Sequence, residues 1–171
     1  MTKLLRLTLM LSGLFALHLF ALDLVSAQDQ FFSNGVRIHY VDQGSGQPVV
    51  LLHGFSGSLD SSWVETSVLP KLATDYRVIA LDYRGYGQSD KPHDPKSYGL
   101  HMGHDVVRLL DHLNIARAHI VGHSMGAGIT AKLLTTHPDR FVTATLSGSA
   151  GRHRWTPEDA AAAEAEAVEF E

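Results

Sequence analysis

The chain has 171 residues, of which 44% are hydrophobic and 19% charged, and its formal charge is −4. This mild, mixed charge provides no basic patch for nucleic acid, so we expect no nucleic-acid partner. The absence of cysteine excludes a disulfide framework, a thiolate nucleophile and cysteine metal ligands.

Residues 1–27 have the layout of a secretory signal peptide. Lys3 and Arg6 give a positive start, an apolar run follows, and Val25-Ser26-Ala27 offers small residues before a cleavage point. We therefore expect a secreted or periplasmic protein. The competing interpretation is an uncleaved membrane anchor over residues 4–25, since ~20 apolar residues suffice to span a bilayer.

The first predicted structure after this leader is a β-hairpin within residues 31–41. The Asn34-Gly35 dipeptide lies between two strand-like pieces, and both turn residues tolerate the positive φ of a tight hairpin turn. Apolar residues then alternate at Val36, Ile38 and Tyr40. This alternation predicts an antiparallel strand with one face in solvent.

Strand-like and helix-like segments alternate over the rest of the chain. The apolar runs predicted as strands are 48–52, 77–82, 118–122 and 141–146. The segments with helical spacing are about 63–72, where Pro70 is expected to split or kink the helix, 98–113 and 125–136. Strands alternating with helices predict an α/β fold, with a mostly parallel sheet and helices on both faces.

The sequence Gly122-His123-Ser124-Met125-Gly126 lies between a predicted strand and a predicted helix. Gly-x-Ser-x-Gly in this context is typical of a nucleophile elbow, a sharp turn that exposes one serine hydroxyl above the sheet. The two flanking glycines would allow a close approach of strand and helix that a Cβ would obstruct.

Two further motifs precede this elbow. They are His53-Gly54-Phe55 and Asp82-x-Arg84-Gly85-x-Gly87-x-Ser89, each after a strand-like run. With the elbow, they resemble the α/β-hydrolase superfamily, specifically its single-domain, serine esterase-like members. The resemblance covers about residues 30–150. It implies an α/β-hydrolase domain over 28–171 with an antiparallel N-terminal hairpin.

The resemblance also implies a site. Ser124 would be the nucleophile, and the backbone N–H groups of Phe55 and Met125 would form the oxyanion hole. The residues expected to support the elbow and its neighbouring loop are His53, Gly54, Gly122, His123 and Gly126. No cofactor and no metal are implied, and the expected partner is a small ester-like substrate.

Other polar residues are predicted to have structural roles. Asp82, Arg84 and Ser89 are interpreted as groups that hold their loop, and His123 is expected to pack rather than face the substrate. The spacing of His101, His104 and Asp105 could hold a metal on a helix, but no further ligand converges on them in sequence, and we expect none.

The resemblance has one main departure. A serine nucleophile needs a histidine base oriented by an acid, and in this superfamily both follow the serine along the chain. After Ser124 the chain offers His137, expected at a helix end far from the elbow, and His153, in a loop where the family inserts its lid. Neither fits a triad. We interpret the sequence as C-terminally truncated, lacking the last strands, and expect it to be inactive or nearly so.

Two expectations concern the C-terminal part. Residues 156–171 begin with an N-cap Thr156 followed by Pro157, and are predicted to start a lid or cap helix. Without later strands, the strand 141–146 would be an uncovered edge with Phe141, Val142 and Leu146 partly exposed, which favours association.

The leading hypothesis is an exported serine hydrolase that cleaves a small ester through an acyl-serine intermediate. One alternative is a cofactor-free perhydrolase or haloperoxidase, which shares these motifs. Another is a non-catalytic, ligand-binding member of the fold. Epoxide hydrolases and haloalkane dehalogenases of similar fold use aspartate at the elbow, and Ser124 argues against both.

Overall fold

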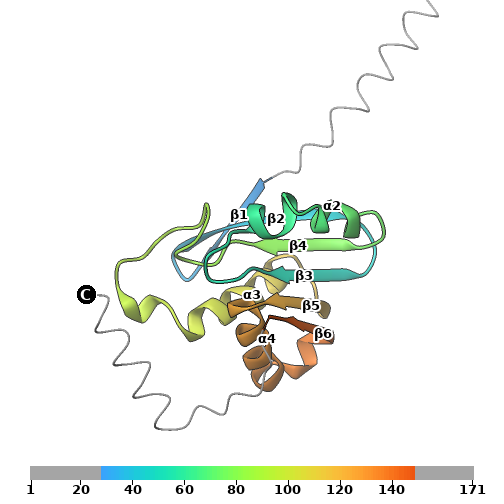
Figure 1. Ribbon diagram of the computed structural model, residues 1–171. Helices are drawn as coiled ribbons and strands as arrows, with labels where there is room; N and C mark the ends of the chain where they lie inside the picture. Colours follow the sequence, from blue (N-terminus) through green and yellow to red (C-terminus); the bar gives the residue numbers. More distant parts are fainter. Residues whose placement is uncertain (1–27, 149–171) are drawn as a thin grey trace, which may run out of the picture.

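The computed structural model describes residues 28–148, which form a six-stranded sheet in the order β1-β2-β4-β3-β5-β6 (Figure 1). Strand β2 pairs antiparallel with β1 and β4, whereas β3, β4, β5 and β6 run parallel to one another. The strands are β1 Gln28–Ser33, β2 Val36–Gly44, β3 Pro48–Leu52, β4 Arg77–Leu81, β5 Ala118–His123 and β6 Phe141–Ser147. The mostly parallel sheet with an antiparallel N-terminal hairpin is as predicted. The predicted signal peptide and lid helix lie outside the described residues.

The helical segments connect these strands. They are η1 Asp60–Val64, α2 Val68–Leu72, η2 Pro95–Ser97, α3 Leu100–His112, α4 Met125–Thr136 and η3 Pro138–Arg140. The helix predicted near 63–72 is indeed split, but the break is not at Pro70. It falls at Ser67, whose φ of 62° is left-handed, and Pro70 lies within the short helix α2.

The β1–β2 hairpin turns at Asn34 and Gly35, with φ angles of 50° and 80°. Positive φ at both positions is the type I′ geometry predicted from this dipeptide. The prediction of a solvated strand face was wrong in the centre of β2. His39 is only 1% exposed and Val41 only 2%, although both alternate with the buried Ile38 and Tyr40. β2 lies inside the sheet, and the loop after β4 covers His39.

Two separate apolar clusters cover the two faces of the sheet. On one face, Ile38, Val50, Leu52, Ile79 and Leu81 pack with residues of α3 and α4. On the other face, side chains of alternate positions in the same strands pack with Leu59, which precedes η1, Trp63 of η1 and Leu69 of α2. Figure 1 shows the same division, with α2 on one side of the sheet and α3 and α4 on the other.

Strand β6 is an edge of the sheet formed by the described residues. Val142 is 50% exposed and Leu146 is 40% exposed, as expected for an uncovered edge. Phe141, in contrast, is only 5% exposed, so its predicted exposure was wrong. Phe141 is a member of the cluster that α3 and α4 cover, which explains its burial.

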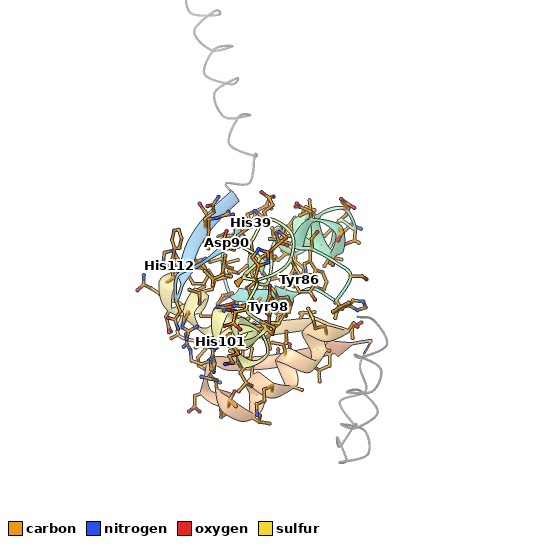
Figure 2. The ribbon with its side chains drawn as sticks, turned by 90° about the vertical axis from the view of Figure 1, so that its left-hand side faces the viewer. His39, Tyr86, Asp90, Tyr98, His101 and His112 are labelled. Carbon is orange, nitrogen blue, oxygen red and sulfur yellow. The ribbon has the colours of Figure 1, made fainter. Side chains whose placement is uncertain are left out.

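Strands β3, β4, β5 and β6 finish at the same end of the sheet, and the loops after β3, β4 and β5 leave the sheet there. Leu52 pairs with Leu81 and with Gly122, and His123 pairs with Ser147, so these parallel strands end in register. Figure 2 is turned toward the side of the long loop after β4, where Tyr86, Asp90 and Tyr98 are labelled. Ligand sites of open α/β sheets form outside the carboxyl ends of the strands. This end of the sheet is therefore where a site is expected.

Candidate functional site

Ser124 lies at the sharp turn between β5 and α4. Its φ of 51° and ψ of −112° are unusual for a residue other than glycine. Such a conformation costs about 1–3 kcal/mol and persists where the surroundings fix it. Here the Ser124 N–H donates to the Ser147 carbonyl at 2.7 Å, and the Ser124 carbonyl accepts from the N–H of Ala127 at 2.9 Å. The side chain is exposed. This is the geometry of a nucleophile elbow.

The two glycines of the motif allow this turn. A Cβ on Gly122 would lie 2.5 Å from the Gly126 carbonyl carbon and 2.5 Å from Thr130 Oγ1. A Cβ on Gly126 would lie 2.8 Å from the His53 carbonyl oxygen, and it would also collide with the Leu52 carbonyl. The first turn of α4 therefore rests directly on the backbone at the end of β3.

The loop His53-Gly54-Phe55 borders the elbow. A Cβ on Gly54 would lie 3.4 Å from the Ser124 Cβ, so this loop and the predicted nucleophile are neighbours. Within residues 28–148, the backbone N–H groups of Phe55 and Met125 donate to no acceptor. Free, fixed N–H groups beside a serine are what an oxyanion requires. The structure thus brings together Ser124, Gly54, Phe55 and Met125.

His53 is fully buried and fixes the loop. Its Nδ1 is 2.8 Å from the Gly54 carbonyl, which can only accept, so Nδ1 carries the proton. Its Nε2 then accepts from the Tyr83 N–H at 3.3 Å. Burial lowers the pKa of His53, while the Gly54 carbonyl and Asp82 act in the opposite direction. A neutral ring with both nitrogens engaged braces the loop and is not free to act as a base.

Tyr86 joins the two predicted oxyanion segments, and sequence reasoning missed this. Its ring lies 5.3 Å from the His53 ring and 6.0 Å from the Phe55 ring, centroid to centroid. Its hydroxyl is 3.7 Å from Met125 Sδ. The sequence indicated only an aromatic loop residue, since these contacts depend on how the loops fold together.

Asp82 holds the loop after β4, as predicted. The carboxylate accepts hydrogen bonds from His39 Nδ1 at 2.8 Å, the Leu59 N–H at 2.7 Å and the Gln88 N–H at 2.9 Å. Ser89 Oγ donates to the Asp82 carbonyl at 2.7 Å. Burial alone would raise the pKa of Asp82, but these hydrogen bonds outweigh it, so the pKa lies below its usual value. His39 was not foreseen, because its approach to Asp82 depends on the β2–β4 pairing.

Arg84 also holds its loop, as predicted, through a partner that the sequence did not indicate. Its Nε and Nη2 donate to the two carboxylate oxygens of Asp105, each at 2.7 Å, and its Nη1 donates to the Ser97 carbonyl at 2.7 Å. Arg84 is 3% exposed and Asp105 is 0% exposed. The pair ties the loop after β4 to α3. It also occupies Asp105, one of the residues considered as a metal ligand with His101 and His104.

No cluster of three histidine or carboxylate residues within 28–148 is arranged to hold a metal ion. The rings of His101 and His104 are 6.1 Å apart, and the His104 ring is 6.1 Å from that of His137. Burial, followed by nearby Arg108 and histidines, lowers the pKa of His104, although Asp105 opposes the shift. The rings of His101, His104 and His137 thus lie next to one another in a row from α3 to the end of α4.

His123 does not pack as expected. The side chain is exposed and lines a cavity of about 540 Å³ together with Trp63 and Ser147. A Cβ on Gly148 would lie 3.1 Å from its ring. His123 shares its strand face with Val121, and within the described residues η1 and α2 cover the neighbouring strands β3 and β4 rather than the end of β5. The expected packing was wrong for this reason.

Within residues 28–148, no side chain hydrogen-bonds to Ser124 Oγ. His137 caps the end of α4, 12 residues long, so it lies about 18 Å from the elbow. His153 lies outside the described residues. The part of the chain that the structure describes therefore presents an exposed serine beside two N–H groups without acceptors, and no side chain there is placed to act as its base. It also contains no helix long and apolar enough to cross a membrane.

Comparison with known proteins places these features in a family. The sequence profile of the alpha/beta hydrolase fold matches residues 47–168. The chain is 42% identical over 110 residues to epoxide hydrolase 3 of Siraitia grosvenorii, covering 64% of this chain and 34% of that protein. It is 39% identical over 124 residues to the 2-hydroxymuconate semialdehyde hydrolase of Pseudomonas sp., covering 71% of this chain and 43% of that protein.

Solved structures agree with this relationship. A Vigna radiata epoxide hydrolase mutant superposes with a TM-score of 0.72 at 32% identity, covering 81% of this chain and 44% of that one. The chain thus spans less than half the length of the relatives described. The matched part includes the elbow and both loops beside it.

Proposed function

Since this chain belongs to the alpha/beta hydrolase fold family, we propose that it acts as a serine hydrolase on a small ester or related acyl bond. The observation that carries this proposal is the elbow: Ser124 is exposed in a strained conformation beside two N–H groups without acceptors. In the proposed reaction, Ser124 Oγ attacks the carbonyl carbon. The N–H groups of Met125 and Phe55 bind the oxyanion, the alcohol leaves, and water then hydrolyses the acyl-serine.

The base is part of the proposal. A serine hydroxyl is a weak nucleophile at neutral pH and needs a group that takes its proton. His53 is engaged on both nitrogens and His137 lies at the far end of α4. We infer that the base and its orienting acid lie outside residues 28–148.

Several relatives are named as epoxide hydrolases. The residue at the elbow distinguishes epoxide hydrolysis from ester hydrolysis. A carboxylate at the elbow opens an epoxide to form an ester, and water can cleave that ester. A serine would form an ether, which has no carbonyl for water to attack. Ser124 therefore supports acyl chemistry over epoxide turnover. The semialdehyde hydrolase relationship is compatible with a carbonyl substrate.

The test is the kinetics of a short-chain nitrophenyl ester with the protein expressed from its complete coding sequence. We expect a burst of nitrophenol followed by slower turnover, and a mass increase on Ser124 equal to the acyl group. Ser124→Ala should reduce kcat by roughly 10⁴-fold or more. An epoxide substrate should not be turned over. Equal ester hydrolysis by Ser124→Ala, or epoxide turnover, would refute the proposal.

Export is a separate proposal that rests on residues 1–27. Their positive start and apolar run favour secretion or delivery to the periplasm. N-terminal sequencing of the expressed protein decides between cleavage before Gln28 and retention as an anchor.

A further inference from the structure

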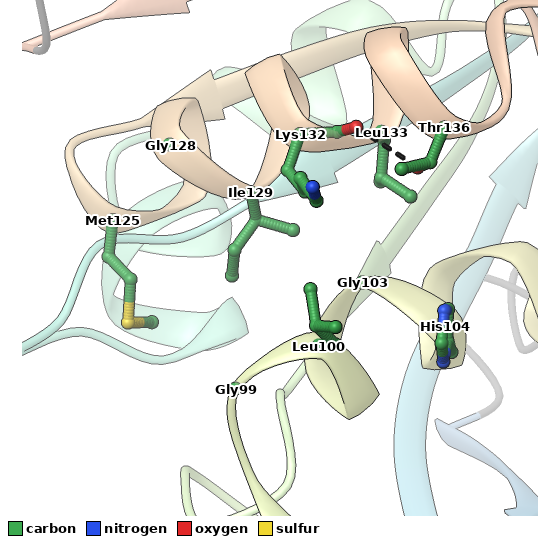
Figure 3. Close-up of a pocket in the computed structure, with 10 residues that line it drawn as sticks. All are labelled: Gly99, Leu100, Gly103, His104, Met125, Gly128, Ile129, Lys132, Leu133 and Thr136. Carbon is green, nitrogen blue, oxygen red and sulfur yellow. Dashed lines mark hydrogen bonds between the residues drawn. The ribbon is translucent and has the colours of Figure 1, made fainter. Parts of the chain in front are cut away.

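A second recess begins at the elbow and runs between α3 and α4. It has a volume of about 720 Å³, and Figure 3 shows Met125 at one end of it, with Ile129 and Leu133 farther along α4. Leu100 of α3 faces these residues and is 62% exposed. An exposed large apolar side chain beside an open apolar groove is typical of a binding site.

Glycines keep this groove open. Gly99, Gly103 and Gly128 all line it. A Cβ on Gly128 would meet nothing within 4 Å, so a larger side chain there would enter free space. Space is also open at Gly99, but its φ of 62° disfavours residues other than glycine. A Cβ on Gly103 would lie 3.5 Å from Leu133, in ordinary contact. At Gly128 and Gly103 the groove is therefore space that side chains could fill without disturbing the fold.

The groove is connected to the predicted chemistry through Met125. The backbone N–H of this residue is a proposed oxyanion donor, and its side chain lines the groove. Lys132 lies seven residues farther along the same helix and also lines the groove. At about 1.5 Å per residue the two positions are about 10 Å apart. An extended carbon chain of about eight bonds covers this distance.

The far end of the groove is cationic. Lys132 forms no ion pair with an acidic side chain of residues 28–148. His104 lines the same end of the groove, but its lowered pKa favours the neutral ring, so Lys132 supplies the charge. The only carboxylate next to His104 in the chain, that of Asp105, is buried against Arg84. An apolar groove whose lysine ammonium pairs with no carboxylate of residues 28–148 complements a ligand with an apolar body and an anionic end.

We propose that this groove binds the acyl part of the substrate, and that the acyl chain ends in a carboxylate. This inference rests on the proposed function, which places the reacting carbonyl at the Met125 end. The apolar chain lies along Leu100 and Ile129, and the terminal carboxylate pairs with Lys132 about 10 Å away. The preferred substrates are half-esters of dicarboxylic acids of about eight carbons.

Binding is measured by titration calorimetry in a Ser124→Ala background, so that no turnover occurs. The probes are monoethyl suberate, which has a free carboxylate, and diethyl suberate, which does not. We expect the half-ester to bind more tightly than the diester. Lys132→Met should weaken half-ester binding about fivefold and leave diester binding unchanged, as expected for a partly exposed ion pair. Lys71→Met, which removes an exposed lysine from α2 on the other face of the sheet, is the matched control.

The groove itself is tested by Gly128→Leu. This variant should lose at least tenfold in affinity for both probes while its thermal midpoint does not fall, because its side chain enters open space. Equal binding of the two probes in the parent and in Lys132→Met would refute the carboxylate contact. Unchanged binding in Gly128→Leu, or no binding in the parent, would refute the groove. Because Ser124 is absent in every variant, these outcomes are independent of whether Ser124 is the nucleophile.

Discussion

Gly126→Ala and Gly128→Ala make a matched pair that tests how closely the elbow helix approaches the sheet. Both residues lie in the first turns of α4, and alanine at either position gains about 1 kcal/mol of helix propensity over glycine. At Gly128 the new Cβ meets nothing within 4 Å. We expect the free energy of unfolding of Gly128→Ala to rise by about 0.5–1 kcal/mol.

At Gly126 the same methyl group meets the backbone of β3. Three backbone atoms of Leu52 and His53 lie within 2.8 Å of the Cβ position, and no side chain can rotate away to relieve the contact. The helix or the strand must shift, and overpacking of this kind typically costs about 1–3 kcal/mol. Net of the propensity gain, we expect the free energy of unfolding of Gly126→Ala to fall by about 1 kcal/mol, and by no more than about 2 kcal/mol.

Urea denaturation followed by far-UV circular dichroism measures both variants against the parent. The two alanines should shift the urea midpoint in opposite directions, so the comparison does not depend on absolute stability. A Gly126→Ala variant with a midpoint equal to or above that of Gly128→Ala would refute the argument from close approach.

Three further predictions follow from other contacts. Arg84→Met should lower the free energy of unfolding by about 3 kcal/mol, because the buried Asp105 carboxylate loses its bidentate partner and keeps only Ser33 Oγ and, at 3.8 Å, Arg108. Arg84→Met combined with Asp105→Leu should cost less than Arg84→Met alone, and urea denaturation checks both variants. The pKa of Asp82 is lower in the folded state than the unfolded value of about 3.9, so the folded state binds fewer protons at this carboxylate. The stability that Asp82 contributes is therefore present above about pH 4 and is lost as the pH falls through the folded pKa. Asp82→Asn should therefore be less stable at neutral pH and should lose less stability on acidification than the parent, and equal slopes in urea midpoint against pH would contradict this. Val142→Lys places a charge on the exposed edge strand β6 and should reduce the self-association of the chain, which sedimentation velocity measures. Unchanged self-association, or a parent protein that is already monomeric, would show that chains do not associate through this edge.

The fold could be predicted from local signals because each signal has a local cause. The Asn34-Gly35 turn depends on two residues that tolerate positive φ, and the buried strands β3 and β4 depend on short, continuous apolar runs. The elbow is predicted from the five-residue pattern around Ser124, although the need for glycine at Gly126 comes from the backbone at the end of β3.

The features that the sequence did not predict have a different cause. The burial of His39, the pairing of Arg84 with Asp105 and the exposure of His123 depend on which strands and loops become neighbours. His39 and its partner Asp82 are 43 positions apart in the chain, and Arg84 and Asp105 are 21 positions apart. Alternation and composition along one segment carry no information about such pairs. The groove between α3 and α4 was not predicted either, because it forms only where these two helices pack together.

The central claim is that Ser124 is an activated nucleophile, and covalent labelling tests it most directly. The protein expressed from its complete coding sequence is treated with a fluorophosphonate probe, and the labelled peptide is identified by mass spectrometry. We predict one adduct per chain, on Ser124, that disappears in Ser124→Ala and after denaturation before labelling. A folded protein that forms no adduct, or one labelled equally on other serines, would contradict the claim.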